Sequence, residues 1–407
     1  MSDDHESPSG PSPVLLTEPR GGVPAVVEDQ PELDRVLDAL GDGIGPVAID
    51  AERASGFRYL PRAYLIQLRR NGSGTFMIDP IRFDDLKSVN NRLGDAEWIL
   101  HAASQDLPCL AEVGMKPARL FDTELAARLC GMERVGLAAL TENLLGYSLE
   151  KHHSAADWST RPLPYDWLKY AALDVELLID LRDRLADELH EQGKQQWALE
   201  EFEALATSPP PAPRKDPWRR TSGIHRVRGA RALARVRELW LARDELARTM
   251  DKAPSKIVPD LAISDAAIAD VSNVGQLLSI PGFQRRHGRA NTQRWLDALA
   301  RARRLPSSDL PHVAAQHDGP PATHRWASRD PEAAARLKQA RLAVAELAEQ
   351  YQLPAENLIA PAAVRALTWQ PPRPADEESV RRALRDSGAR NWQIDITAAA
   401  LTQSLTD

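Results

Sequence analysis

Two proline-rich breaks divide this chain of 407 residues and limit what each part of it can fold into. The first, Ser208-Pro-Pro-Pro-Ala-Pro213, cannot continue a helix, because proline lacks the amide donor and its ring clashes with the preceding turn. The second runs from Leu305 to Pro331 and holds four prolines before its last residue. Since domains span roughly 100–200 residues, the chain is expected to form several folding units.

The segments between the breaks differ in pattern. The first mixes short β-type runs with helical stretches, whereas the two later segments are helical throughout. The predicted boundaries are a disordered tail over 1–13, an α/β domain over 14–207, a Pro-rich linker over 208–226, a helical domain over 227–304, a linker over 305–331 and a second helical domain over 332–407.

Composition excludes several classes of protein. No apolar run approaches the roughly 20 residues that span a bilayer, and no apolar stretch follows a basic N-terminus, so neither a membrane span nor a signal peptide is predicted. The two cysteines, Cys109 and Cys130, are too few for a disulfide framework or a cysteine-rich zinc site. They suit a reduced, cytoplasmic protein.

The charge is distributed unevenly along the chain. The whole sequence has a net charge of -7, which by itself argues against a nucleic-acid partner. Between Arg214 and Arg304, however, 20 basic residues stand against 9 acidic ones, a net charge of +11. This middle segment is therefore the part expected to meet phosphate groups, while the remainder is acidic.

Four β-type runs define the predicted sheet of the first domain. Pro46–Asp50, Ala63–Leu68 and Thr75–Asp79 follow one another closely, with the turn sequence Asn71-Gly-Ser-Gly74 between the last two, and predict an antiparallel meander. Trp98–Ala102 is a fourth strand. Helices are expected from Gln105 onward and over Thr123–Cys130 and Leu137–Leu145, so the architecture is a mixed sheet flanked by helices.

Two acids follow the first apolar run. Asp50 and Glu52 are separated by one residue, so both side chains project from the same face of a strand. Two carboxylates held together repel one another unless a cation lies between them, and Mg²⁺ prefers such oxygen ligands. The alternative is a solvated strand end.

Three more residues extend this pattern. Asp106 follows the fourth strand at the predicted start of a helix, where the alternative is an acid favoured by the helix dipole. Tyr170 and Asp174 have the spacing that places both on one helical face, beside an apolar stripe where an unpaired acid is costly. The alternative there is an amphipathic edge with a chance tyrosine.

Taken together, this constellation resembles the DEDD exonuclease superfamily, in its tyrosine branch, and specifically the ribonuclease D family. The resemblance covers about residues 14–206. It rests on six sequence motifs: Ile49-Asp-Ala-Glu52, Leu65-Ile-Gln-Leu68, His101-Ala-Ala-Ser-Gln-Asp106-Leu, Phe121-Asp-Thr123, Asp157-Trp-Ser-Thr-Arg-Pro-Leu163 and Tyr170-Ala-Ala-Leu-Asp174.

The resemblance implies a ribonuclease H-like fold and 3′-to-5′ hydrolysis of phosphodiesters with two divalent metal ions, Mg²⁺ or Mn²⁺. It implies that Asp50 bridges both ions. Glu52 and Asp174 would complete the site that activates water, and Asp106 would hold the second ion through water. Tyr170 would orient the attacking water, since a phenol with a pKa near 10 is a poor base at neutral pH.

Ala51 and His101 are candidate substrate-binding residues, and for His101 the alternative is a hydrogen-bonding scaffold role. Asp122 and Asp166 are interpreted as a turn acid and a helix cap. The sequence departs from the family after Glu52, where Arg53-Ala-Ser-Gly56 stands in place of an aromatic residue found in many relatives.

The helical segments resemble HRDC domains. The first carries Pro254-Ser-Lys-Ile-Val-Pro259 and Ser279-Ile-Pro-Gly-Phe283, and its basic charge predicts contact with nucleic acid. The second repeats the turn as Asn357-Leu-Ile-Ala-Pro361, without the basic excess, and is interpreted as an HRDC-like bundle that packs on the other modules.

These features predict a monomeric exoribonuclease that trims structured RNA such as tRNA precursors. Two alternatives remain open at this point. A DNA exonuclease acting in repair is one, because nothing in the motifs distinguishes ribose from deoxyribose. A non-catalytic RNA-binding scaffold is the other, although the intact set of five site residues argues against it.

Overall fold

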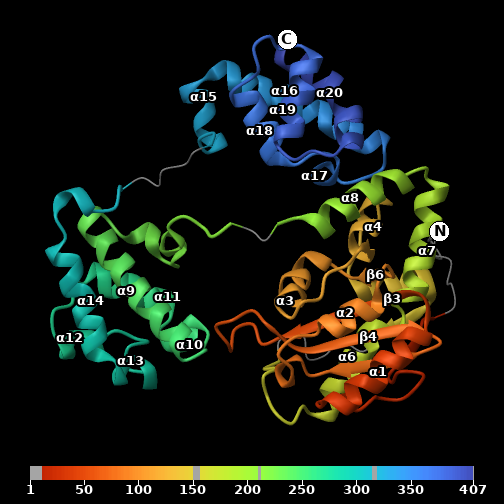
Figure 1. The fold of residues 1–407 in the computed structure, drawn as a ribbon. Helices are drawn as coiled ribbons and strands as arrows, with labels where there is room; N and C mark the ends of the chain where they lie inside the picture. The colour runs from red at the N-terminus through yellow and green to blue at the C-terminus, as the bar shows by residue number, and fades with distance from the viewer. Residues whose placement is uncertain (1–11, 150–155, 210–211, 314–318, 407) are drawn as a thin grey trace, which may run out of the picture.

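The computed structural model describes residues 12–149, 156–209, 212–313 and 319–406 (Figure 1). The predicted tail therefore lies outside the described residues up to position 11, as do two residues of the first predicted linker and five of the second. In the described part of the chain, no helix is long and apolar enough to cross a membrane.

The α/β domain is built on a mixed sheet, as predicted, but the sheet has six strands where four were expected. The antiparallel meander consists of β3 (Ile44–Arg53), β4 (Ala63–Asn71) and β5 (Gly74–Ile78). The strands β6 (Glu97–Leu100) and β7 (Arg119–Asp122) extend the sheet in parallel beyond β3, and β2 (Val26–Val27) pairs in parallel with β5. A separate two-stranded sheet joins β1 (Val14–Leu16) to β8 (Tyr147–Leu149).

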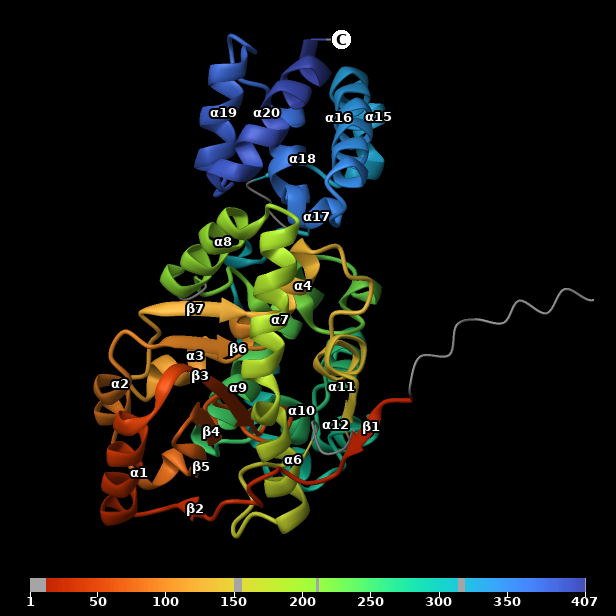
Figure 2. The same ribbon diagram turned by 90° about the vertical axis from the view of Figure 1, so that its right-hand side faces the viewer.

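Helices cover both faces of the six-stranded sheet (Figure 2). On one face, α6 (Tyr165–Glu176) packs across β3, β4 and β5. The helices of this domain are α1 (Gln30–Asp42), α2 (Lys87–Leu93), α3 (Leu107–Glu112), α4 (Thr123–Leu129), α5 (Leu137–Leu140), α6 (Tyr165–Glu176), α7 (Leu178–Glu191) and α8 (Gln195–Thr207).

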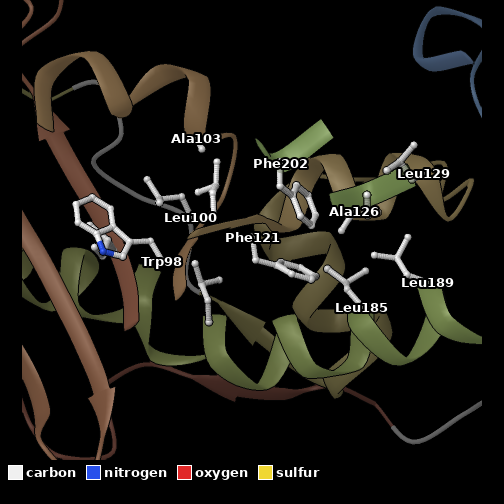
Figure 3. Close-up of a cluster of buried hydrophobic side chains, with 14 of the residues drawn as sticks. Trp98, Leu100, Ala103, Phe121, Ala126, Leu129, Leu185, Leu189 and Phe202 are labelled. Atoms are coloured by element: carbon white, nitrogen blue, oxygen red, sulfur yellow. The ribbon is translucent and has the colours of Figure 1, made fainter. Parts of the chain in front are cut away.

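Apolar side chains of β6 and β7 meet those of α4, α7 and α8 in a shared core (Figure 3). Phe121 and Phe202 lie with their ring centroids 4.8 Å apart, and Trp98 and Leu185 are almost fully buried. Burying each such side chain contributes about 1.5–3 kcal/mol, so this core fixes the sheet edge next to the predicted site. Cys109 and Cys130 are buried and free.

The middle bundle comprises residues 217–304. Its helices are α9 (Ala230–Thr249), α10 (Pro254–Ile257), α11 (Asp260–Ile268), α12 (Val274–Leu278), α13 (Arg286–Ala290) and α14 (Thr292–Arg304). Trp218 is buried in its core with Trp295, although Trp218 lies in the predicted linker 208–226. A tryptophan buries a large apolar surface, so the bundle takes in the second half of that segment.

The C-terminal bundle comprises residues 323–406. Its helices are α15 (Trp326–Arg329), α16 (Pro331–Gln350), α17 (Ala355–Leu358), α18 (Pro361–Trp369), α19 (Glu377–Asp386) and α20 (Asn391–Thr406). Trp326, in the predicted linker 305–331, is fully buried in this bundle. The indole of Trp392 stacks on Trp197 of α8 at 4.9 Å and donates to Glu201, so this bundle and the α/β domain share one core.

Candidate active site

Asp50 and Glu52 lie within the last four residues of β3. The predicted strand stops at Asp50, but pairing with β4 continues to Arg53, opposite Ala63. Asp50 stands opposite Gln67 in this register. Since alternate residues of a strand share one face, both carboxylates project towards the face that α6 covers.

The helix α6 completes a carboxylate cluster. One oxygen atom each of Asp50, Glu52 and Asp174 lies within 4.8 Å of the others. Tyr170, one turn before Asp174 on the same helix, hydrogen-bonds to that carboxylate, in accord with their spacing of four residues. The structure thus brings together three of the four predicted metal ligands and the tyrosine.

Asp106 lies outside this group of three. It lies at the N-terminal end of α3, where the predicted alternative of an acid favoured by the helix dipole stays open, and its side chain makes no capping hydrogen bond within the described residues. Instead, a guanidinium nitrogen of Arg53 lies 3.5 Å from its carboxylate and also donates to Gln105 at 3.4 Å. Sequence reasoning missed this role of Arg53, although a cation directly after two acids was the available signal.

Burial raises the pKa of all four acids above their ordinary values. Desolvation is the largest cause in each case, and it raises the pKa of Asp106 to about 8. The negative charge of Asp50 is the next cause for Glu52, Asp106 and Asp174. Burial and the charges of Asp174, Glu52 and Asp50 also raise the pKa of Tyr170, so its hydroxyl keeps its proton at neutral pH.

The donor set fits a hard divalent cation. All of the gathered atoms are carboxylate oxygens, which Mg²⁺ and Mn²⁺ prefer. The Gln67 amide, opposite Asp50, is buried and has no hydrogen-bond partner in the part of the chain that the structure describes. A cation and its water would relieve both the mutual repulsion of the acids and the unmet polar atoms.

Two anchors hold α6 in place over the sheet. At its end, the buried Glu176 lies 3.3 Å from a guanidinium nitrogen of Arg69 on β4. In its first half, the fully buried Trp158 packs against Trp167 and Tyr170, with ring centroids 5.4 and 6.5 Å apart. The segment carrying Trp158 is itself fixed by Arg161.

Arg161 joins this segment to the sheet. Its guanidinium donates to both oxygens of the buried Asp79 at 2.7 and 2.8 Å and to the carbonyl oxygens of Trp158 and Tyr64. Paired, hydrogen-bonded charges of this kind hold a single geometry. The stretch from Asp157 to Leu163 is thus tied to the sheet and supports α6, the last helix of the site.

Asp122 organises the turn that carries Asp106. Its carboxylate accepts hydrogen bonds from the amides of Ala102 and Ala103 at 3.1 and 2.8 Å, and it also caps α4. Ala102 has a φ of 59°, a strained conformation for a residue other than glycine, and these bonds stabilise it. Asp122 is thus a helix cap that also shapes the site.

The two candidate substrate-binding residues, His101 and Ala51, have different surroundings. His101 is held through Nδ1 by Thr123 at 2.9 Å, and burial lowers its pKa to about 4, so the ring is neutral. This supports the scaffold alternative. The Ala51 side chain lies in the hydrophobic core, and its amide hydrogen-bonds to Asp50, so any contact with substrate would use its backbone. Both contacts with substrate stay predictions.

Three family models match this chain. A "3'-5' exonuclease" model covers residues 24–190, an "HRDC domain" model covers 232–299, and a "3' to 5' exonuclease C-terminal domain" model covers 319–405. The matches follow the α/β domain, the middle bundle and the C-terminal bundle in order.

Named relatives agree with these matches. The chain is 31% identical to ribonuclease D of Gluconacetobacter diazotrophicus over 67% of this chain and 71% of that protein. A crystal structure of a protein from Bifidobacterium adolescentis matches with a TM-score of 0.89 and 40% identity, over 97% of this chain and 100% of that one. Escherichia coli RNase D matches with a TM-score of 0.68 and 25% identity, over 94% and 98%.

Proposed function

The chain belongs to the ribonuclease D family of 3′-to-5′ exoribonucleases, and on that premise we propose that it removes 3′ nucleotides from structured RNA by two-metal hydrolysis. The observation that carries this proposal is the convergence of Asp50, Glu52 and Asp174 within 4.8 Å, beside Tyr170. A scaffold would not require three mutually repelling carboxylates held at least half-buried.

Each residue has a proposed place in this chemistry. Asp50, central in the cluster, would be shared by both cations, with Glu52 and Asp174 on one and Asp106 on the other. When bound, Mg²⁺ or Mn²⁺ would supply positive charge opposite the attacking and leaving oxygens. Tyr170 keeps its phenolic proton, so it would orient the attacking water by a hydrogen bond.

Arg53 would change partners as the site fills. Its guanidinium lies 3.5 Å from Asp106 and favours the ionised form of that acid. A cation at Asp106 would replace this contact and free the guanidinium to meet a phosphate of the substrate.

Precursors of tRNA are the proposed class of substrate. The Escherichia coli relative is described as an exoribonuclease involved in structured RNA processing, which supports structured RNA here. We further propose that the protein acts as a monomer.

The choice of RNA over DNA is directly testable. With Mg²⁺ or Mn²⁺ present, the protein should release nucleotides one at a time from the 3′ end of an RNA oligomer. A DNA oligomer of matched sequence should be degraded more slowly, because such a site has to read the 2′-hydroxyl. Equal or faster degradation of DNA would favour the repair alternative, and no degradation of either would refute the proposal.

A basic surface on the middle bundle is the proposed RNA contact. Half of its arginines are engaged with acids of the same bundle, as in Arg226–Asp265 at 2.6 Å. The exposed Arg285, Arg286 and Arg289 form no ion pair within the described residues. Unpaired cations can neutralise phosphates without first losing a protein partner.

Changing these three arginines to glutamine should raise the KM for a structured RNA and leave kcat for a trinucleotide unchanged. The dependence of binding on salt should weaken, with the log–log slope falling by roughly 0.7–0.9 for each phosphate that the protein no longer neutralises. Salt titrations of binding and steady-state kinetics measure both effects.

The matched control removes the same charge from ion-paired positions, as Arg226→Gln, Arg294→Gln and Arg301→Gln. It should change the KM less. An equal effect of the two triple variants would show that only net charge matters.

A further inference from the structure

The loop of residues 54–62, which directly follows the Asp50–Glu52 strand, docks on the middle bundle. In Figure 1, α10 is the helix of this bundle that lies nearest to the α/β domain. The ring of Tyr59 packs against the apolar core of the bundle, and its hydroxyl donates to Asp244 of α9 at 3.0 Å. A loop beside the catalytic acids is thus anchored in another folding unit.

Asp251 is the second anchor. It follows α9, and one oxygen of its carboxylate accepts hydrogen bonds from the amides of Tyr59 and Leu60 at 3.2 and 3.3 Å. The amide of Ala253 donates to the carbonyl of Phe57 at 3.0 Å. These backbone contacts fix the path of the loop, since a carboxylate that accepts two amides leaves little freedom to either residue.

Arg58 links Asp251 of the middle bundle to Ser159 of the α/β domain. Its guanidinium lies 3.8 Å from Asp251 and donates through Nε to the Ser159 hydroxyl at 2.8 Å. That hydroxyl donates in turn to Asp157, so Arg58 is linked through Ser159 to the turn that carries Trp158. A single side chain of the docked loop therefore touches both the middle bundle and the segment that supports α6.

Trp158 connects the turn bound by Arg58 to the catalytic residue Tyr170. It is fully buried and packs on Trp167 and Tyr170 of α6, with ring centroids 5.4 and 6.5 Å apart. Ala54, the first residue of the loop, is buried in the same cluster. Close-packed side chains transmit small displacements, so a shift of the docked loop would move the ring of Tyr170.

We infer that docking of the middle bundle on this loop positions the catalytic centre, with Arg58 as the positioning residue between Asp251 and the turn under Tyr170. The bundle thus has a second role besides contact with RNA. This inference rests on the proposed function, because it assigns Tyr170 to the reaction. It predicts that weaker docking slows turnover even of substrates too short to reach the bundle.

The test uses the full chain and Asp251→Gly, which removes the carboxylate. Glycine suits this position, because Asp251 has a φ of 45°. With a trinucleotide RNA as substrate, kcat should fall roughly ten- to hundred-fold, the loss that a small misplacement of reacting groups causes. The KM should change little. The conservative variant Asp251→Asn keeps an acceptor oxygen and should recover most of the activity.

Asp270→Gly is the matched control. Asp270 lies in the same bundle, has a φ of 47° and pairs with Arg303, but it is not one of the residues that hold the loop. This variant should leave kcat for the trinucleotide unchanged. If Asp251→Gly does so too, and only the KM for long RNA rises, the bundle contributes RNA binding alone and the inference is wrong.

Hydrogen exchange separates this inference from the proposed function. Amides of residues 157–170 should exchange faster in Asp251→Gly than in the wild type or in Asp270→Gly, whatever the substrate. A wild type that degrades no RNA would refute the proposed function without changing this result. Unchanged exchange in Asp251→Gly would refute the positioning role even in an active enzyme.

Discussion

Replacing Asp50 with asparagine is expected to lower kcat for release of the 3′ nucleotide by roughly 10³-fold or more. Charge stabilisation by the cations contributes several kcal/mol, and each 1.36 kcal/mol is a factor of ten in rate. Asp50 is the one member of the cluster whose charge raises the pKa of Glu52, Asp106 and Asp174 alike. Its charge therefore acts on every other acid proposed to hold the cations.

Steady-state kinetics at saturating Mg²⁺ measure this loss, and calorimetric titration of Mg²⁺ should show weakened binding. Asp166→Asn is the matched control, because Asp166 is an exposed acid in the first turn of the same α6 that carries Asp174. Its kcat should stay close to that of the wild type. An Asp50→Asn enzyme with the turnover of the wild type would remove Asp50 from the proposed mechanism.

The sheet and the site acids were largely predictable, because they depend on local pattern. Alternating residues placed Asp50 and Glu52 on one face, and the spacing of Tyr170 and Asp174 placed them on one side of a helix. The missed strands β1, β2, β7 and β8 are only two to four residues long, and such short runs carry little periodicity. They are strands because neighbouring strands supply their hydrogen-bond partners.

Features that depend on tertiary contact could not be predicted from local pattern. Trp218 and Trp326 lie in proline-rich sequence that looks like linker, and only the cores that receive them show otherwise. The partner of Asp106 is Arg53, 53 positions earlier and on another element. The docking of Tyr59 on Asp244 joins residues of two folding units, and no spacing rule connects them.

Loss of metal should make the stability of the protein depend steeply on pH. Burial raises the pKa of Asp106 from its ordinary 3.8 to about 8 in the folded protein. Between these values the folded state holds a proton that the unfolded state has released, so stability is greatest at the acid end and falls as pH rises towards 8. Asp50, Glu52 and Asp174 are shifted in the same direction and add to the effect.

Thermal unfolding in chelator, compared with excess Mg²⁺, measures this dependence. Mg²⁺ binds the deprotonated acids of the folded state, so it should raise the Tm by several degrees at pH 8 and hardly at all at pH 5. In chelator, Asp106→Asn should become more stable than the wild type as pH rises from 4 to 8, since the amide cannot ionise. Gln105→Ala also removes a contact of Arg53 but no titrating group, so its difference from the wild type should stay constant with pH. If Asp106→Asn parallels the wild type at every pH, the buried acids do not oppose one another in the metal-free fold. The cation would then not be needed to hold them together.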